Sequence, residues 1–308
     1  MRRGVGLSLL AVVGVAAAAA VAQEPVLRDP RLFRSGIEIT SVNATVRDME
    51  GRLVTGLSRD AFELYEDGER QAITQFTNER VPVSLGVLLD TSDSMFGRRI
   101  KDARAAVERF LFELLDPGDE YFVMAFNHRP HPLTSWTNTP EIVRQALNRV
   151  RPGGGTAAYD GVIAALPMFT KRTRERAALV IISDGADTAS DGSLRTVHSS
   201  LVRSEAFVYA VAIDSSDRKA INTGVNPTSL REITDDSGGR TEIVHSSEEL
   251  ADATARIAEE LNSQYLLGYT SPHGGDGRYH SIRVRVRGTD YKVRARNGYV
   301  ATPRDNSR

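Results

Sequence analysis

The central part of the chain alternates short, continuously apolar runs with longer segments in which apolar residues recur at helical spacing. The runs have the length of strands buried on both faces, and the intervening segments have the length of helices. Parallel strands joined by crossover helices produce this alternation, so it predicts a doubly wound, mostly parallel α/β sheet with helices on both faces. The predicted strands are 83–90, 121–126, 177–183, 207–213 and 241–244, with a short strand near 133, and the predicted helices are 100–115, 140–150, 157–169, 194–204, 227–236 and 248–264.

Both ends of the chain show a different pattern, in which apolar and polar residues alternate as in strands with one buried face. Near the N-terminus, Asp67-Gly68 is a hairpin signal, and we expect 73–76 to be the return strand. Because these strands are too few for an independent domain, we expect them to pair with the C-terminal ones. The pattern therefore predicts a smaller β-sandwich-like domain built from both ends of the chain. Its expected strands are 37–39, 42–48, 62–66 and 73–76, then 265–269, 279–287 and 291–296.

The N-terminus has the order of a secretory signal peptide. Arg2-Arg3 precede an apolar stretch from Gly4 to Val21, which closes with Ala20-Val21-Ala22. We expect an exported protein, periplasmic or extracellular, that is attached to a membrane only if this segment stays uncleaved as an anchor. The expected organisation is a signal peptide at 1–22, N-terminal β-strands at 23–80, the α/β domain at 81–264, C-terminal β-strands at 265–300 and a tail at 301–308.

Amino-acid composition excludes few classes of function. The net charge is −1, so the balance of charges does not indicate a nucleic-acid partner. The chain has no cysteine, and its fold is therefore expected to hold without disulfides.

The most informative motif comes where the first apolar run ends. Asp90, Ser92 and Ser94 follow that run at every second position and would deliver three oxygen groups to the carboxyl edge of the sheet. Ligands bind at this edge in open α/β sheets. Carboxylate, hydroxyl and water oxygens suit a hard divalent cation, above all Mg²⁺, with Mn²⁺ or Ca²⁺ as alternatives. The other interpretation is that these side chains only cap the next helix.

Asp90-x-Ser92-x-Ser94 resembles the first segment of the metal-ion-dependent adhesion site of von Willebrand factor A domains. The loop Gly153-Gly154-Gly155-Thr156 and the strand that ends in Ser183-Asp184-Gly185 resemble its second and third segments, in the same order. Helix capping would not account for these two segments. The resemblance implies that Ser92 and Ser94 bind the metal directly and that Thr156 binds directly or through water. It also implies that Asp90 and Asp184 act mainly through waters and hydrogen bonds.

The flanking segments resemble a group of exported bacterial von Willebrand A-related proteins. They carry YEDG and YLLGY before and after the α/β domain, and VRARNGY near the end. This resemblance covers nearly the whole chain after residue 22, and it implies architecture more than activity.

These observations predict a metal-dependent protein-binding module, of adhesion or scaffold type, that captures an exposed Asp or Glu carboxylate of a protein partner. Neutral hydroxyl ligands leave much of the metal's charge available for such an anion. An alternative is a structural envelope protein in which the metal only stabilises the fold, and a less favoured one is a metal-dependent hydrolase. We expect no enzyme and assign no catalytic residue, because the sequence has no Gly-x-Ser-x-Gly elbow and no P-loop.

Three further groups have a functional and a simpler interpretation. Asp187 and Asp191 could bind Ca²⁺, but a solvated polar loop is favoured. His128 and His131 are expected in a surface turn at the same edge as the metal motif. Five arginines at alternate positions of two C-terminal strands could bind a sugar or a phosphate, although a solvated strand face is favoured. They are Arg283, Arg285, Arg287, Arg294 and Arg296.

Overall fold

The structure is a computed structural model that describes residues 39–184, 187–214, 227–288 and 290–301. All of these residues belong to a single contact unit, residues 38–308. The expected signal peptide at 1–22, the first two residues of the expected strand 37–39 and residues 302–308 lie outside them. None of the helices formed by the described residues is long and apolar enough to cross a membrane.

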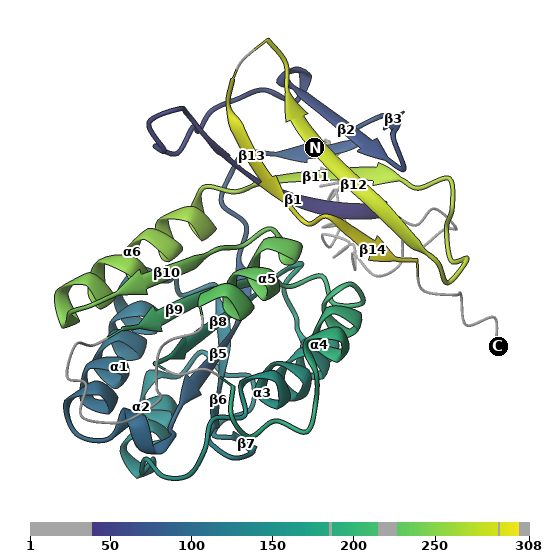
Figure 1. Ribbon diagram of the computed structural model, residues 1–308. Helices are drawn as coiled ribbons and strands as arrows, with labels where there is room; N and C mark the ends of the chain where they lie inside the picture. The colour runs from purple at the N-terminus through teal and green to yellow at the C-terminus, as the bar shows by residue number, and fades with distance from the viewer. Residues whose placement is uncertain (1–38, 185–186, 215–226, 289, 302–308) are drawn as a thin grey trace, which may run out of the picture. The chain divides into compact units, whose positions relative to one another are not determined.

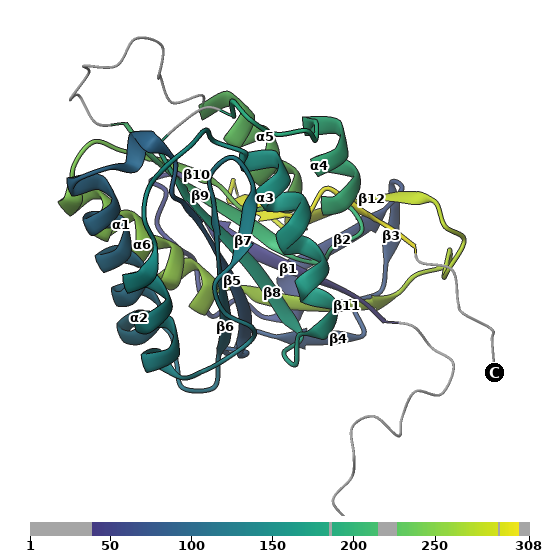
Figure 2. The same cartoon turned by 90° about the horizontal axis from the view of Figure 1, so that it is seen from below.

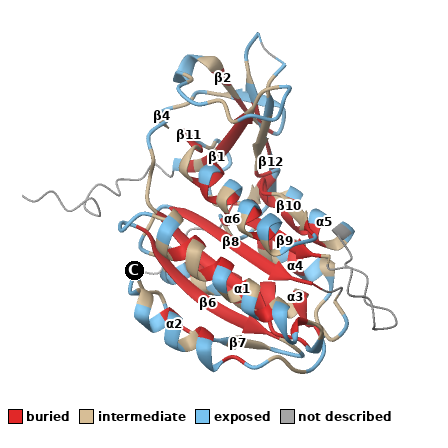
Figure 3. Cartoon of the chain, turned by 90° about the vertical axis from the view of Figure 1, so that its left-hand side faces the viewer, coloured by how far each residue is buried: buried red, intermediate tan, exposed pale blue. Residues whose placement is uncertain are grey.

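The described part of the chain contains a six-stranded sheet in the order β10-β9-β8-β5-β6-β7. All pairs are parallel except β6–β7, which is antiparallel. The central strands are buried along their whole length, as Figure 3 shows in red. The strands are β5 (Val83–Asp90), β6 (Glu120–Phe126), β7 (Pro130–Pro132), β8 (Arg176–Ser183), β9 (Phe207–Ile213) and β10 (Thr241–Val244).

Helices cover both faces of this sheet (Figure 2). Apolar residues of α1, α2 and α6 share one buried cluster with alternate residues of the strands, such as Val87 and Leu89. Residues of α3, α4 and α5 form a second cluster with the opposite set, such as Leu88. This arrangement confirms the predicted doubly wound α/β fold. The helices are α1 (Arg98–Arg109), α2 (Pro140–Arg149), α3 (Ala158–Ala165), α4 (Leu194–Leu201), α5 (Pro227–Ser237) and α6 (Ser247–Asn262).

Two predicted helices are shorter than their apolar pattern suggests. The expected helix 100–115 is α-helical to Arg109 and continues as a π-helical turn, Phe110–Leu114. The expected helix 157–169 ends as an α-helix at Ala165 and continues as a 3-10 helix, Leu166–Lys171. Pro167, which lacks an amide hydrogen, lies at the start of that second segment.

Strands from the two ends of the chain form two four-stranded sheets, β13-β1-β11-β4 and β14-β12-β2-β3 (Figure 1). The N-terminal β1 (Ile39–Arg47) pairs antiparallel with β11 (Tyr265–Thr270) and β13 (Lys292–Ala295). In the other sheet, β12 (Tyr279–Val286) pairs antiparallel with β2 (Phe62–Glu66) and β14 (Gly298–Val300). Inward residues of both sheets share one apolar cluster, which agrees with a β-sandwich-like domain.

The hairpin that starts at β2 differs from its prediction. Asp67 and Gly68 both have positive φ, 50° and 85°, which is the geometry of a two-residue hairpin turn. The return strand therefore begins at once, as β3 (Glu69–Gln71). The expected return strand 73–76 was wrong, because β4 (Gln75–Thr77) pairs with β11 in the other sheet.

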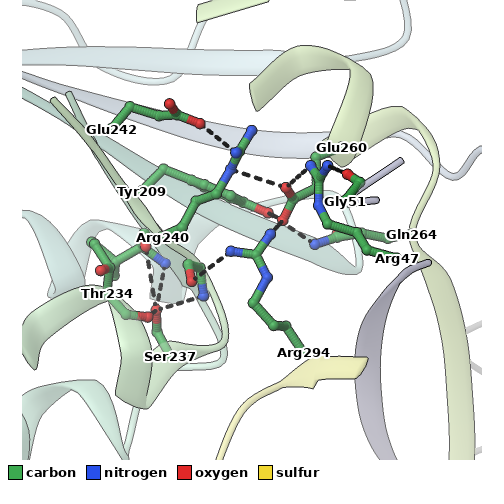
Figure 4. A network of polar contacts seen from close by, with 12 residues as sticks. Arg47, Gly51, Tyr209, Thr234, Ser237, Arg240, Glu242, Glu260, Gln264 and Arg294 are labelled. Carbon is green, nitrogen blue, oxygen red and sulfur yellow. Dashed lines mark hydrogen bonds and ion pairs between the residues drawn. The ribbon is translucent and has the colours of Figure 1, made fainter. Parts of the chain in front are cut away.

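A buried carboxylate on α6 links the two parts of the described chain (Figure 4). Glu260 has no exposed side-chain surface and accepts hydrogen bonds from Arg47 (2.9 Å) and Arg294 (2.5 Å), which lie on β1 and β13. From the α/β domain, Arg240 forms an ion pair with it (3.2 Å) and the Tyr209 hydroxyl donates a hydrogen bond (3.2 Å). Three cations thus share one carboxylate where the sandwich meets the α/β domain.

The five arginines of the C-terminal strands do not share one face, because Arg294 and Arg296 contact other parts of the protein. Arg294 binds Glu260, and Arg296 is buried and donates to the Ser41 carbonyl (2.8 Å). Alternate residues share a face only within one strand or between neighbouring strands, but β12 and β13 belong to different sheets. Of the other three, Arg283 and Arg285 are exposed, and Arg287 pairs with Glu63 (3.0 Å).

Polar contacts also hold the opposite end of the central sheet. Glu120 accepts hydrogen bonds from the Ser84 hydroxyl (2.6 Å) and from the backbone and hydroxyl of Thr173 (2.6 and 2.8 Å). Burial by itself would raise the pKa of Glu120, but these hydrogen bonds outweigh it and the pKa is lowered. Nearby, a Cβ at Gly86 would lie 2.5 Å from the Phe122 ring, so this position has room only for glycine.

Candidate metal centre

Asp90 ends the central strand at the point where the strand order of the sheet reverses. The chain goes from β5 to β6 on one side, and later places β8 on the other side of β5. Loops that follow β5 and β8 therefore diverge at this point, which is where open α/β sheets bind ligands. Asp90 is fully buried, and its two carboxylate oxygens accept hydrogen bonds from the Ser92 backbone (2.8 Å) and the Ser183 hydroxyl (2.5 Å).

The predicted serines and the second aspartate continue this chain of contacts. After β5 the backbone forms a 3-10 turn, Asp93–Met95, which brings the Ser92 and Ser94 hydroxyls within 2.9 Å of each other. The Ser94 hydroxyl donates to Asp184 (2.6 Å), which directly follows β8 and is also buried. Four of the five predicted residues thus form one hydrogen-bonded group.

The fifth residue, Thr156, is buried in the glycine-rich loop, and backbone contacts hold this loop to the turn after β5. Gly153 donates to the Thr91 carbonyl (2.8 Å), and Asp93 donates to the Gly154 carbonyl (2.9 Å). Gly154 has a φ of +87°, and a Cβ there would meet the His128 ring at 2.8 Å. The loop therefore lies beside the serine turn.

A cationic side chain lies at this group of oxygen atoms. Arg99, in the first turn of α1, donates to the Asp184 carboxylate (2.7 Å) and to the Ser94 carbonyl (2.8 Å). The oxygen cluster thus holds a positive charge in this structure. Sequence reasoning missed Arg99, and its only signal was a basic residue five positions after Ser94.

The electrostatics of Asp90 also fit a cation. Burial raises the pKa of Asp90 to about 6, and the neighbouring carboxylate of Asp184 adds to this rise, although hydrogen bonds from Ser183 and Ser92 oppose it. Two buried carboxylates and three hydroxyl side chains at one sheet edge are oxygen donors only, the set that Mg²⁺ and Ca²⁺ accept. The residues present therefore fit a hard divalent cation.

The surroundings of the centre include polar and apolar groups that a ligand could contact. His128 and His131 lie in the turn beside the glycine-rich loop, and His131 contacts the Asn127 side chain (3.2 Å). Phe96, two residues after Ser94, is 77% exposed. An aromatic side chain in solvent beside a charged cluster is a feature of interaction surfaces, and sequence reasoning did not identify it.

Asp187 and Asp191 have structural contacts instead of a calcium-binding arrangement. Asp187 accepts hydrogen bonds from the Tyr159 backbone (2.9 Å) at the start of α3 and from the Ser190 hydroxyl (2.5 Å). Asp160, on α3, accepts from the backbones of Asp191 and Gly192 (2.9 Å each). These contacts agree with the favoured interpretation of a polar loop.

Comparison with known proteins identifies the family that the central α/β domain resembles. Residues 85–186 match the family model of the von Willebrand factor type A domain. The minor fimbrium subunit Mfa5 of Porphyromonas gingivalis is 28% identical over 116 residues, which are 35% of this chain and 9% of that protein. The human inter-alpha-trypsin inhibitor heavy chain H4 is 20% identical over 229 residues, 69% of this chain and 24% of that protein. The chain thus spans only a small part of these relatives.

A solved structure agrees at the level of the fold. The von Willebrand factor type A structure from Catenulispora acidiphila has a TM-score of 0.53 and 13% identity, and the match covers 79% of this chain and 74% of that one. Together with the strand order and the helices on both faces, the family match shows that the chain contains a domain of the von Willebrand factor type A family.

Proposed function

We propose that the α/β domain is a protein-interaction module of an exported protein, and that it binds a partner through a divalent cation held at Asp90, Ser92, Ser94, Thr156 and Asp184. The observation that carries this proposal is the connected group Asp90–Ser92–Ser94–Asp184 at the reversal point of the sheet. Such a group brings oxygen donors from two separate loops to one place, whereas helix capping would need only one loop.

The residues have distinct roles in this proposal. The hydroxyls of Ser92 and Ser94, with Thr156, would be the direct ligands, while Asp90 and Asp184 would orient them through hydrogen bonds. Mg²⁺ is the expected ion, with Mn²⁺ or Ca²⁺ as alternatives. When bound, the ion would supply a positive centre for one more oxygen ligand, and an exposed Asp or Glu carboxylate of a protein partner has the matching chemistry.

Two observations support an interaction role over a purely structural one. Phe96 is exposed beside the centre and would give the partner an apolar contact next to the charged one. One relative of this domain is named a minor fimbrium subunit. Export rests on the signal-peptide pattern of residues 1–22.

The test is titration calorimetry of the purified protein with Mg²⁺. We expect saturable binding of one ion to the wild type and no binding to Asp90→Ala. Asp191→Ala is the matched control, because it removes an exposed carboxylate from a nearby loop and should bind as the wild type does. Equal binding by the wild type and Asp90→Ala would refute the metal centre.

The partner side of the proposal needs a second measurement. Glutamate-containing peptides immobilised on a surface should retain the wild-type protein in Mg²⁺ and release it in chelator. Phe96→Ala should bind Mg²⁺ normally and yet bind the peptides more weakly. If Asp90→Ala lowered the melting temperature but left peptide binding unchanged, the metal would serve only the fold.

A further inference from the structure

A second group of potential metal ligands lies in the β-sandwich, where the β2–β3 turn meets the loop between β11 and β12. It consists of Asp67 in the turn, His273 and Asp276 in the loop, and His280 near the start of β12. One nitrogen of each histidine and one carboxylate oxygen of Asp67 lie within 4.8 Å of one another. This group contains imidazoles, which the predicted Mg²⁺ centre lacks.

The three potential ligand atoms lie close together. The Asp67 Oδ2 atom lies 2.8 Å from His280 Nδ1 and 3.8 Å from His273 Nε2. The two imidazole rings are stacked almost parallel, with centroids 4.4 Å apart and an interplanar angle of 9°. A metal ion binds an imidazole in the plane of its ring, so the half-exposed His273 ring has to rotate for both nitrogens to reach one ion. Donor atoms bound to one tetrahedral Zn²⁺ are about 3.3 Å apart, given ligand distances of about 2.0 Å. The two observed separations lie on either side of this value.

Neighbouring groups hold two of the three ligands in place. The other nitrogen of His280, Nε2, lies 3.0 Å from the carboxylate of Asp276. Metal-binding histidines commonly donate their second ring N–H to a carboxylate in this way. The first nitrogen, Nδ1, is hydrogen-bonded to Asp67 Oδ2 (2.8 Å), and a bound ion would replace this contact. Asp276 is itself held by the Arg278 backbone (2.8 Å).

Asp67 is positioned just as firmly. Its Oδ1 atom accepts hydrogen bonds from the backbone (2.8 Å) and hydroxyl (3.1 Å) of Ser281, so its Oδ2 atom points toward the histidines. Asp67 is also the only non-glycine residue with positive φ among the described residues, since it occupies the tight turn. The hairpin that the sequence signalled at Asp67-Gly68 thus places a carboxylate against the loop.

We propose that Asp67, His273 and His280 form a metal site for Zn²⁺ or a similar first-row transition ion, with Asp276 as the positioning residue for His280. Two imidazoles and one carboxylate suit such ions and not Mg²⁺ or Ca²⁺. His280 is nearly buried, whereas the side chains of Asp67 and His273 are 39% and 41% exposed. A fourth position is therefore open to water or to a donor from another molecule, and the ion would tie the loop to the turn.

The proposal can be tested with the untagged protein in excess Mg²⁺, which competes with Zn²⁺ at the predicted centre in the α/β domain. Competition with a chromophoric zinc chelator should show one Zn²⁺ bound per chain. His273→Gln removes an exposed ligand without opening a cavity and should weaken Zn²⁺ binding at least tenfold. Asp276→Asn leaves the three ligands in place and should weaken it by about 10- to 100-fold.

Controls distinguish this site from incidental binding by surface histidines. His245→Gln changes an exposed histidine outside the group and should leave Zn²⁺ binding unaltered. Co²⁺ in place of Zn²⁺ should give the visible absorption of a four-coordinate ion in the wild type and in His245→Gln, and lose it in His273→Gln. The proposal fails if the wild type binds no Zn²⁺, or if His273→Gln and Asp67→Asn bind Zn²⁺ as tightly as the wild type. Neither result depends on the Mg²⁺ centre.

Discussion

Replacement of Glu260 by glutamine should destabilise the protein strongly, although the two side chains have nearly the same size. Glu260 is wholly buried and neutralises part of the charge of Arg47, Arg240 and Arg294. The Glu260→Gln variant keeps the volume of the side chain and removes the negative charge. Three guanidinium groups would then face one another with a neutral amide between them.

The expected loss follows from the cost of an uncompensated buried charge. Removal of one partner from a buried ion pair costs about 3–5 kcal/mol. Here Arg240 keeps a second partner, Glu242, and Arg47 and Arg294 keep some contact with water, with side chains 20% and 28% exposed. We therefore expect a loss of about 3–4 kcal/mol in the free energy of unfolding. For a domain of this size, such a loss lowers the melting temperature by about 10 °C.

Differential scanning calorimetry and urea denaturation would measure this loss. Glu259→Gln is the matched control, because it makes the same change one position earlier on α6, at an exposed residue. Because two of the arginines come from the β-sandwich, Glu260→Gln should also separate the thermal unfolding into two transitions. If both variants lay within about 1 kcal/mol of the wild type, the network would contribute little to stability.

Three other predictions concern the metal centre, pH and packing. Arg99→Gln should raise the Mg²⁺ affinity about tenfold, because it removes a positive charge that competes with the ion. Arg98→Gln, at an exposed position, should leave the affinity unchanged. A lower Mg²⁺ affinity of Arg99→Gln on calorimetry would contradict this. Glu120→Gln should lower the free energy of unfolding at neutral pH, and its difference from the wild type should shrink as the pH falls below about 4.5. The reason is that the lowered pKa of the Glu120 carboxylate gives stability that is lost when the carboxylate is protonated. A difference in urea denaturation that stays constant down to acidic pH would refute this. Gly86→Ala should cost about 1–3 kcal/mol through overpacking, whereas Gly118→Ala, which meets only ordinary contacts, should cost little; equal melting temperatures would contradict it.

Patterns within short stretches of sequence predicted much of the α/β domain. The strand Phe207–Ile213 lies where the apolar run places it, because burial on both faces requires an apolar residue at nearly every position. The position of Asp90 at the end of β5 follows from the same rule, because the apolar run stops at a carboxylate. Asp90, Ser92, Ser94 and Asp184 come together for a topological reason, since the parallel strands β5 and β8 end at one edge of the sheet.

The alternation of apolar and polar residues was less informative about which strands pair with each other. The segment 73–76 has the alternation of a return strand. However, the tight turn at Asp67-Gly68 pairs Glu69–Gln71 with β2, and β4 pairs with β11. Arg294 shares its alternation with the arginines of β12, and yet it belongs to another sheet and meets Glu260. Local periodicity says which side of a strand is apolar, and it does not say which strand lies beside it.

The amino-acid sequence by itself thus determined the class of the fold, most of its elements and the grouping of Asp90, Ser92, Ser94 and Asp184, because each depends on residues close together in the chain or on one shared sheet edge. Only the tertiary structure decided the contacts between distant segments. Arg47 meets Glu260, and Asp67 meets His280, across 213 positions in each case. No local pattern encodes such pairs, since they arise from the antiparallel pairing of the two ends of the chain and from the packing of the sandwich against α6.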